Sequence, residues 1–296
     1  MGDLYNEFRS FHDRIALAPG RKAVLRTARH AIRERIRKYF RDTLNVGVPK
    51  FRGQGAYAMG TMVNPIGGEY DIDDGVYLQH LDNRNDTDWP AASAIHQWLV
   101  KAAQWHTREK PMAKRTCVRV RYPGLYHIDL PSYAELNGLF RLAVKGQARW
   151  PPSDPMTLAY WFNATAKFHG EQLRRMVRYL KAWADFQSGR WGKLPGGLIL
   201  TVLAANYFQG HAKDDIALAN MFQAISNAVN TICYVLNPVD FSEVLTERLS
   251  DAQKTRFIDA VKAAADDAHQ AIVQKDAHRA SKLWRKQLGD RFPLAG

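Results

Sequence analysis

The stretch EYDIDDGVYL, residues 69–78, decides the fold prediction, because polar and apolar residues alternate along it as they do in a β-strand. Side chains two residues apart in a strand point to the same face, so Asp71 and Asp73 project together while Ile72 faces the core. Two carboxylates in one small volume repel each other unless a cation compensates, and Mg²⁺ prefers such oxygen ligands. Surface strands often carry an Asp-x-Asp pair, so the pair alone has little specificity.

A second segment, YHIDLPSY at residues 126–133, adds one more acidic position. Asp129 lies between Ile128 and Leu130, which would face the core while the carboxylate faces the site. Three carboxylates from neighbouring strands can hold two Mg²⁺ ions. One ion would lower the pKa of a sugar hydroxyl, and the other would neutralise charge on a donor triphosphate. Nucleotidyl transfer needs mainly this positioning and electrostatic stabilisation.

Upstream of the first strand, the segment GQGAYAMGT at residues 53–61 places glycines where backbone N–H groups can approach a phosphate closely. An ordinary tight turn would have the same composition. The order of these features is more specific than any one of them. A glycine turn, then an Asp-x-Asp strand, then a lone Asp on a later strand is the ordered signature of polymerase β-like nucleotidyltransferases.

The surrounding sequence predicts an α/β lobe over residues 1–150. Apolar residues recur at helical spacing from Arg21 to Leu44, with Arg and Lys on the opposite face. That basic face is either simply solvated or a surface that binds phosphates or nucleic acid, and the sequence leaves both interpretations open. A helix over residues 91–105 and strands over residues 114–122 and 126–133, the last broken by Pro131, complete the lobe.

A boundary is expected at RWPPSDP, residues 149–155, because its prolines end any preceding element and Ser153 or Asp154 can cap the next helix. Residues 151–296 read as helical, and Ser250 and Gln253 have capping-box spacing at the start of the last predicted helix. We therefore predict an α+β protein. A polymerase β-like nucleotidyltransferase lobe, a mixed sheet with helices, would pack on a C-terminal helical lobe that closes the nucleotide-binding cleft.

Composition narrows the class of partner without naming a function. The chain of 296 residues has a formal net charge of +13 and a pI near 9.8, which favours phosphate-bearing partners. Its two cysteines lie far apart outside any CxxC pattern, so a zinc site or disulfide framework is not expected. Neither a secretion signal nor a long uninterrupted apolar run occurs, and we expect a cytoplasmic protein without membrane contact.

The chain resembles the cGAS/DncV-like nucleotidyltransferases, or CD-NTases, which make cyclic di- or trinucleotide messengers in bacterial anti-phage (CBASS) defence. Within that group it is most similar to the DncV-type cyclic GMP-AMP synthases. The resemblance covers most of the chain and rests on these segments in the family's order: QGAYAMGTMVNP, EYDIDDGVYL, TCVRVR, YHIDLPSYA, WPPSDPMTLAYWFN, LRRMVRYLKAWAD and LGDRFP.

This resemblance implies roles for individual residues. Asp71, Asp73 and Asp129 would be the catalytic metal ligands for two Mg²⁺ ions, with Mn²⁺ as an expected substitute. Lys181 would contact the triphosphate as a point charge, although a snorkelling surface lysine would fit the pattern too. The full set of expected nucleotide-binding residues is Gln54, Gly55, Ala56, Tyr57, Thr61, Arg119, Ser153, Asp154, Lys181 and Gly196.

Some of these assignments have ordinary structural alternatives. Ser153 and Asp154 would contact a base or ribose, but a helix cap explains them nearly as well, and both roles can coexist. Arg119 matches a position implicated in acceptor-base recognition, although it also reads as a strand-surface charge.

One departure concerns the donor phosphate. The family usually has Ser where this chain has Ala56, so a hydroxyl contact is lost, with Thr61 or backbone amides as candidate substitutes. The loss would reduce activity about tenfold.

The expected function is Mg²⁺-dependent condensation of ATP with GTP into a cyclic dinucleotide for anti-phage signalling. A linear oligonucleotide synthase is one alternative, and a catalytically weak nucleotide- or RNA-binding member of the fold, motivated by Ala56 and the basic charge, is another. Nucleic acid is not required for the first function. CBASS partner proteins are expected, including a ubiquitin-transfer-like enzyme acting on Gly296, while a frayed terminus remains the simpler interpretation of the tail.

Overall fold

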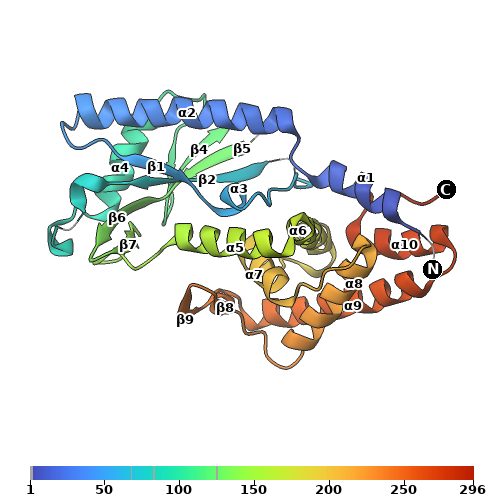
Figure 1. The fold of residues 1–296 in the computed structure, drawn as a ribbon. Coiled ribbons are helices and arrows are strands. Elements are labelled where there is room, and N and C mark those ends of the chain that lie inside the picture. Colours follow the sequence, from blue (N-terminus) through green and yellow to red (C-terminus); the bar gives the residue numbers. More distant parts are fainter. Residues whose placement is uncertain (1–2, 68, 83, 125) are drawn as a thin grey trace. The chain divides into compact units, whose positions relative to one another are not determined.

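The strand predicted around Asp71 is β2, Tyr70–Tyr77, and it lies inside a mixed sheet. The computed structural model describes residues 3–67, 69–82, 84–124 and 126–296 (Figure 1), and within them the sheet has seven strands in the order β3-β4-β5-β2-β6-β7, with β1 also paired to β2. Strand β2 pairs in parallel with β5 and β6 and antiparallel with β1. The central position of β2 agrees with the buried, alternating pattern of its sequence.

The helices and strands predicted around the sheet lie close to their predicted positions, whereas the short elements at residues 50–53, 55–58, 112–113 and 139–142 were not predicted individually. The predicted break at Pro131 separates two strands, and its carbonyl oxygen accepts a hydrogen bond of 2.8 Å from the backbone of Val76. The strands are β1 (Lys50–Gly53), β3 (Met112–Ala113), β4 (Val118–Tyr122), β5 (Tyr126–Leu130), β6 (Ser132–Leu136) and β7 (Leu139–Leu142); the helices are α2 (Pro19–Asp42), the short α3 (Gly55–Ala58) and α4 (Ala92–Ala103).

The basic helix α2 runs along the sheet (Figure 1), and part of its charge has a structural use. Arg29 is 7% exposed, and its guanidinium lies 2.7 Å from a carboxylate oxygen of the fully buried Asp74. Arg33 binds the same carboxylate. A buried carboxylate needs such partners, so at least these two arginines compensate Asp74 inside the protein instead of forming a phosphate-binding surface.

The C-terminal half is helical as predicted, with two differences. It contains a small hairpin, and the helix that starts at the Ser250–Gln253 capping box, which is confirmed, is not the last one. A helix at the N-terminus was also not predicted. These elements are α1 (Tyr5–Ile15), α5 (Pro155–His169), α6 (Glu171–Trp191), α7 (Gly197–Tyr207), α8 (Asp214–Val229), β8 (Leu236–Asn237), β9 (Asp240–Val244), α9 (Asp251–Val273) and α10 (Ala277–Leu288).

Aromatic side chains explain why α1 and the C-terminal segment pack with the helices. Phe8 of α1 lies with its ring centroid 5.0 Å from that of Phe292 and 5.1 Å from that of Trp284, both in edge contacts. All three side chains are at most 2% exposed. Burying several large rings contributes several kcal/mol, and the edge geometry adds to it.

The chain divides into two compact units. The sheet unit comprises Leu17–Met59 and Gly67–Ala159, and the helical unit comprises Met1–Ala16, Gly60–Ile66 and Tyr160–Gly296. The segments 1–16 and 60–66, which fall in the expected first lobe, thus group with the helices. That residues 151–296 close a nucleotide-binding cleft remains a prediction. Across the described residues, every helix is too short or too polar to cross a bilayer.

Candidate active site

The three predicted carboxylates lie on one face of the sheet unit. Strands β2 and β5 are parallel and in a register that pairs Asp73 with Asp129 and Asp71 with His127. Ile72, Ile128 and Leu130 are completely buried, as the alternation predicts. The opposite face therefore carries the acidic residues, and the pairing of Asp73 with Asp129 places two carboxylates on adjacent strands at the same level.

Arg119 already holds one of these carboxylates. It pairs with Asp129 across the antiparallel β4–β5 ladder, and its Nε and Nη2 atoms each donate a 2.7 Å hydrogen bond to the Asp129 carboxylate. The same Nη2 lies 4.0 Å from an oxygen of Asp71. One guanidinium can reach both carboxylates only if they share a face, so this contact confirms that Asp71 and Asp129 lie on the same side of the sheet.

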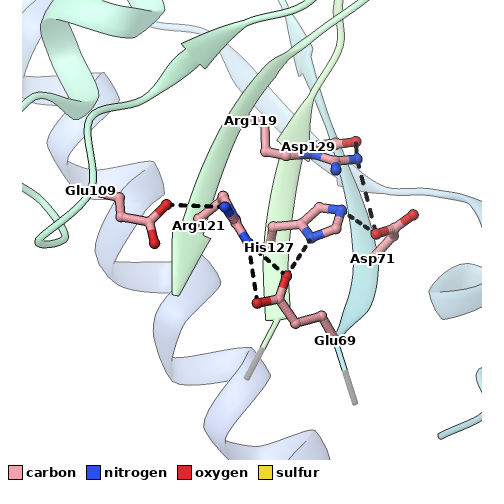
Figure 2. Close-up of polar contacts among 7 residues, drawn as sticks. All are labelled: Glu69, Asp71, Glu109, Arg119, Arg121, His127 and Asp129. Atoms are coloured by element: carbon pink, nitrogen blue, oxygen red, sulfur yellow. Dashed lines mark hydrogen bonds and ion pairs between the residues drawn. The ribbon is translucent and has the colours of Figure 1, made fainter. Parts of the chain in front are cut away.

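His127 holds the other carboxylate, and the sequence interpretation assigned it no role. Figure 2 shows its imidazole between Asp71 and Glu69, with Nε2 forming an ion pair with Asp71 and Nδ1 4.0 Å from Glu69. Arg121 continues the chain of contacts by binding Glu69 and Glu109. His127 lies two residues before Asp129 in the same strand, so the period of two was the signal that could have identified it.

Asp73 differs from its two neighbours because, among the described residues, its side chain makes no hydrogen bond or ion pair. Burial, together with the charges of Asp129 and Asp71, raises the pKa of Asp73 to about 6. Burial also opposes ionisation of Asp71, but its contact with His127 and the nearby Arg119 lower its pKa. Although Arg119 and His127 lower the pKa of Asp73 in part, the cluster holds one carboxylate without a direct cationic partner, which is the condition that a bound cation relieves.

The three aspartates offer carboxylate oxygens, which are the ligands that divalent cations such as Mg²⁺ prefer. As they stand, the described residues contain no group of three His, Cys, Asp or Glu side chains placed to hold a metal ion. Figure 2 shows Arg119 bound to Asp129 and His127 in contact with Asp71. Asp73, in contrast, has no such partner among the described residues.

The glycine-rich segment forms the first turn of α3 beside Asp73. Gly55 has φ +55°, and a Cβ built on it would lie 2.6 Å from an Asp73 carboxylate oxygen, so only glycine fits. Ala56 is half-buried in α3. Tyr57 lies with its ring 4.3 Å from the guanidinium of Arg29.

Gln54 is only 3% exposed, and both polar ends of its side chain are hydrogen-bonded inside the sheet unit. Its Nε2 donates to the Tyr77 hydroxyl at 2.9 Å, and its Oε1 accepts from Tyr133 at 3.2 Å. The side chain of Gln54 therefore links Tyr77 and Tyr133 of the sheet. A contact between Gln54 and a phosphate would have to come from its backbone.

Asp154 is a helix cap in the structure. Its Oδ1 accepts hydrogen bonds of 3.1 and 3.0 Å from the backbone N–H groups of Met156 and Thr157 at the start of α5. Ser153 donates its backbone N–H to Phe140 at 2.9 Å. The capping role is therefore confirmed, and the predicted nucleotide contacts of Ser153 and Asp154 stay predictions.

A second cluster of expected site residues belongs to the helical unit. Lys181 on α6 donates hydrogen bonds from Nζ to the Thr61 hydroxyl at 3.0 Å and to the Thr61 carbonyl at 3.3 Å. Burial, and to a smaller extent Arg178, lowers the pKa of Lys181 to about 7. The predicted Gly196 precedes α7, but a Cβ there would meet nothing, whereas one at Gly197 would lie 3.0 Å from Lys181. Lys181 is half-buried, and its ammonium forms no ion pair with the described residues, so it is suited to an anionic partner.

The sequence itself matches a known domain. Residues 49–133, which include all three aspartates, match the family model described as cyclic GMP-AMP synthase DncV-like, nucleotidyltransferase domain. The chain carries a DncV-like nucleotidyltransferase domain. It is 25% identical to a cyclic GMP-AMP synthase of Escherichia coli strain TW11681, over 81% of this chain and 68% of the relative. A cyclic GMP-AMP synthase of Vibrio cholerae serotype O1 is also 25% identical, over 60% of this chain and only 51% of its own length.

Solved structures show the same fold around this domain. Vibrio cholerae DncV cyclic AMP-GMP synthase matches with a TM-score of 0.82 over 99% of this chain and 98% of its own, at 18% identity. Escherichia coli DncV in its 3′-deoxy GTP bound form matches with a TM-score of 0.79 over 94% and 93% of the two chains, at 20% identity. The α+β fold class is thereby confirmed. Because the sequence identity to these structures is only 18–20%, the structural similarity is evidence for the fold and not for the function.

The Arg119–Asp129 contact leads to a prediction about metal affinity. We expect Arg119→Gln to bind Mn²⁺ about three- to tenfold more tightly, because the guanidinium competes for Asp129 and repels a cation. Isothermal titration of the nucleotide-free protein measures this directly. Arg121→Gln is the matched control, since Arg121 lies on the same strand but binds Glu69 and Glu109. Equal Mn²⁺ affinity in wild type and Arg119→Gln would show that Arg119 does not oppose the metal.

Proposed function

We propose that this chain condenses nucleoside triphosphates, ATP with GTP, into a cyclic dinucleotide in a reaction that depends on Mg²⁺. One observation carries the proposal: Asp71, Asp73 and Asp129 share one face at the β2–β5 pair of a DncV-like nucleotidyltransferase domain. The names of the relatives support a cyclic dinucleotide product, and the bound ligands of the solved DncV structures, GTP analogues and ATP with GTP, support triphosphate substrates.

In this proposal, the chemistry of each side chain gives it a separate role. Asp71, Asp73 and Asp129 would hold two Mg²⁺ ions, which when bound activate an acceptor hydroxyl and neutralise charge on the departing pyrophosphate. His127 orients the Asp71 carboxylate, and Gly55 keeps the α3 backbone against Asp73. In the helical unit, Lys181 supplies a positive charge for the triphosphate while the Thr61 oxygens position its ammonium.

The product of a labelling experiment tests this function. Purified protein incubated with Mg²⁺ and radiolabelled ATP and GTP should yield a phosphatase-resistant species with the mass of a cyclic dinucleotide. A ladder of phosphatase-sensitive products would instead identify a linear oligonucleotide synthase. Unreacted triphosphates from folded protein would favour the catalytically weak alternative, which Ala56 motivates. Mass spectrometry of products from an equimolar mixture of all four triphosphates identifies the bases that are joined.

A role in anti-phage signalling, with CBASS partners, belongs to the same proposal and rests on the family resemblance. The C-terminal segment bears on the partner that would act on Gly296. Its backbone is held by a 3.0 Å hydrogen bond from the Ala295 N–H to the Ser281 hydroxyl and a 2.7 Å contact of the Ala295 carbonyl with His278. Phe292 is completely buried. An enzyme that acts on Gly296 would therefore meet a segment that is held on the helical unit up to Ala295.

Residue 56 provides a gain-of-function prediction. We expect Ala56→Ser to raise turnover up to about tenfold, because a serine hydroxyl at the start of α3 would add one hydrogen bond to the donor phosphate. Steady-state synthesis at saturating ATP and GTP measures the change. Ala58→Ser, in the same short helix, is the control. If both variants match the wild type, the missing hydroxyl does not limit this enzyme.

A further inference from the structure

A segment of the helical unit, residues 60–66, is held along one face of helix α6. The side chains of α6 that bind it are three and four residues apart and belong to Arg178, Lys181 and Asp185. Side chains at this spacing share one face of a helix. Their partners follow in the same order along the segment: the Gly60 carbonyl, Thr61 and the backbone N–H of Ile66.

The two ends of this segment are held in different ways. Asn64 donates its backbone N–H to Ile15 at 2.7 Å and its side-chain amide to Ala16 at 2.9 Å, so the later part of the segment has support from other elements. At the earlier end, the hydrogen bonds that Gly60 and Thr61 form with the described residues come from α6 alone. The placement of Thr61 therefore depends on the side chains of α6.

Thr61 in turn sets the direction of the Lys181 ammonium. Thr61 is completely buried, and its hydroxyl and carbonyl oxygens accept hydrogen bonds of 3.0 and 3.3 Å from Nζ of Lys181. An ammonium group has three donors, so two are used here and one is left for a ligand. The two Thr61 oxygens fix where that remaining donor points.

Arg178 holds the residue before Thr61. Its Nη2 donates to the Gly60 carbonyl, and its Nη1 lies 3.1 Å from Nε2 of His12 on α1. A guanidinium can only donate, so the His12 ring accepts with Nε2 and is neutral. Burial and the charge of Arg178 lower the pKa of His12, which agrees with a neutral ring. The Arg178 side chain is thus fixed from one side by α1 and fixes Gly60 on the other.

The charge of Arg178 has an electrostatic cost in the unliganded protein. Arg178 and Lys181 lie one turn apart on α6, both are half-buried, and neither forms an ion pair with the described residues. Like charges at this spacing repel each other, and the charge of Arg178 contributes to the lowered pKa of Lys181. An anion bound at Lys181 would offset this repulsion, so the pair is suited to a phosphate-bearing ligand.

We propose that Arg178 is a positioning residue for triphosphate binding: it holds the Gly60 carbonyl on α6, and this keeps the Thr61 oxygens where they orient the Lys181 ammonium. The role rests on the proposed function, because it takes Lys181 as the phosphate contact. Arg178 acts through Lys181 and makes no phosphate contact of its own, since its guanidinium is bound to Gly60 and His12.

A double-mutant cycle measures whether Arg178 acts through Lys181. Calorimetric titration of the full chain with a nonhydrolysable GTP analogue at pH 6.5 compares the wild type, Arg178→Gln, Lys181→Met and the double variant. Arg178→Gln alone should weaken binding about three- to tenfold, because Lys181 loses its orientation. In the Lys181→Met background the same change should have no effect, to within about twofold. Equal weakening in both backgrounds would overturn the proposal, because a direct phosphate contact or a general loss of structure does not require Lys181.

A conservative variant separates positioning from folding. A lysine at position 178 can still donate to the Gly60 carbonyl, so Arg178→Lys should bind the analogue within about threefold of the wild type. Arg190→Gln, at an exposed arginine of the same helix that lies over the Trp191 ring, is the matched control and should bind like the wild type. Circular dichroism checks that each variant folds.

Thr61→Val tests the same chain of contacts without changing Arg178. Valine has nearly the shape of threonine and lacks the hydroxyl that accepts from Lys181, so binding should weaken about three- to tenfold. Unchanged binding by Thr61→Val would refute the positioning role even if Arg178→Gln does not fold.

The outcomes for the proposed function are distinct from these. Weak binding by Lys181→Met together with wild-type binding by Arg178→Gln would refute the role of Arg178 and leave the synthase proposal intact. The expected coupling in a protein that makes no cyclic dinucleotide would support the role of Arg178 and refute the synthase. Wild-type binding by Lys181→Met would contradict the phosphate contact and, with it, the positioning role.

Discussion

Asp73→Asn is expected to lower the rate of nucleotidyl transfer by about a thousandfold or more. Among the three aspartates, Asp73 is the one whose side chain makes no hydrogen bond or ion pair with the described residues, so it would be free to hold a cation. An amide keeps its shape and loses its charge, and loss of the stabilisation that metals give to developing charge is worth several kcal/mol. Single-turnover synthesis at saturating Mg²⁺ measures the loss. Asp259→Asn, at an exposed carboxylate on α9, should retain full activity.

The same substitution should stabilise the metal-free protein. The folded state raises the pKa of Asp73 to about 6 from an ordinary 3.8, so it binds a proton that the unfolded chain has released between these values. Stability contributed by this group is therefore lost as the pH rises from about 4 to about 6, and at pH 7 ionised Asp73 costs about 3 kcal/mol. A neutral amide at this position avoids the cost, so melting in EDTA at pH 7 should move up by a few degrees.

Metal addition separates the two effects. Mn²⁺ should raise the melting temperature of the wild type and leave that of Asp73→Asn almost unchanged, since only a ligand that binds the folded state stabilises it. An Asp73→Asn protein that retains both product formation and Mn²⁺ stabilisation would refute the assignment of the three carboxylates to metal binding. A protein that loses activity but keeps Mn²⁺ stabilisation would place the metals elsewhere.

The second large effect concerns Lys181 and has a characteristic pH dependence. We expect Lys181→Met to weaken the binding of a nonhydrolysable GTP analogue by roughly 10- to 100-fold at pH 6.5, the worth of one charge-assisted hydrogen bond. Burial lowers the pKa of Lys181 to about 7, so the unliganded lysine loses its charge as the pH rises above that value. A phosphate favours the charged form, and wild-type affinity should therefore fall above pH 7.

Two further variants make this test specific. Lys181→Arg keeps its charge at every pH of interest, so its affinity should stay flat where that of the wild type declines. Lys262→Met, at an exposed lysine on α9, is the control and should follow the wild type. Calorimetric titrations between pH 6 and 9 distinguish the outcomes. A flat wild-type profile with weak binding by Lys181→Met would mean that the lysine binds phosphate without a lowered pKa, and an unaffected Lys181→Met would remove the residue from the site.

The local pattern of the sequence was enough to predict that the three aspartates lie on one face of the sheet. The period of two in a strand is a property of the backbone, so burial of Ile72, Ile128 and Leu130 forces the aspartates beside them to the other face. The capping box at Ser250 and the cap at Asp154 are equally local, since each involves residues within one turn of a helix. Such features need no knowledge of distant contacts.

Only the tertiary structure showed which charged side chains contact each other. The ion pair between His127 and Asp71 and the two hydrogen bonds from Arg119 to Asp129 depend on the register of three strands, which no single segment encodes. Glycine at position 55 suits the local φ of +55°, but the close approach of the Asp73 carboxylate is brought about by the fold, from a separate strand.

The sequence by itself determined three features in their order along the chain: a glycine turn, then three aspartates on one face of the sheet, then a helical half. It could not determine the partners of α1 or the lowered pKa of Lys181, because each arises where segments distant in sequence pack together. Periodicity acts along the chain, whereas burial, field and cavity volume are properties of the space between its segments.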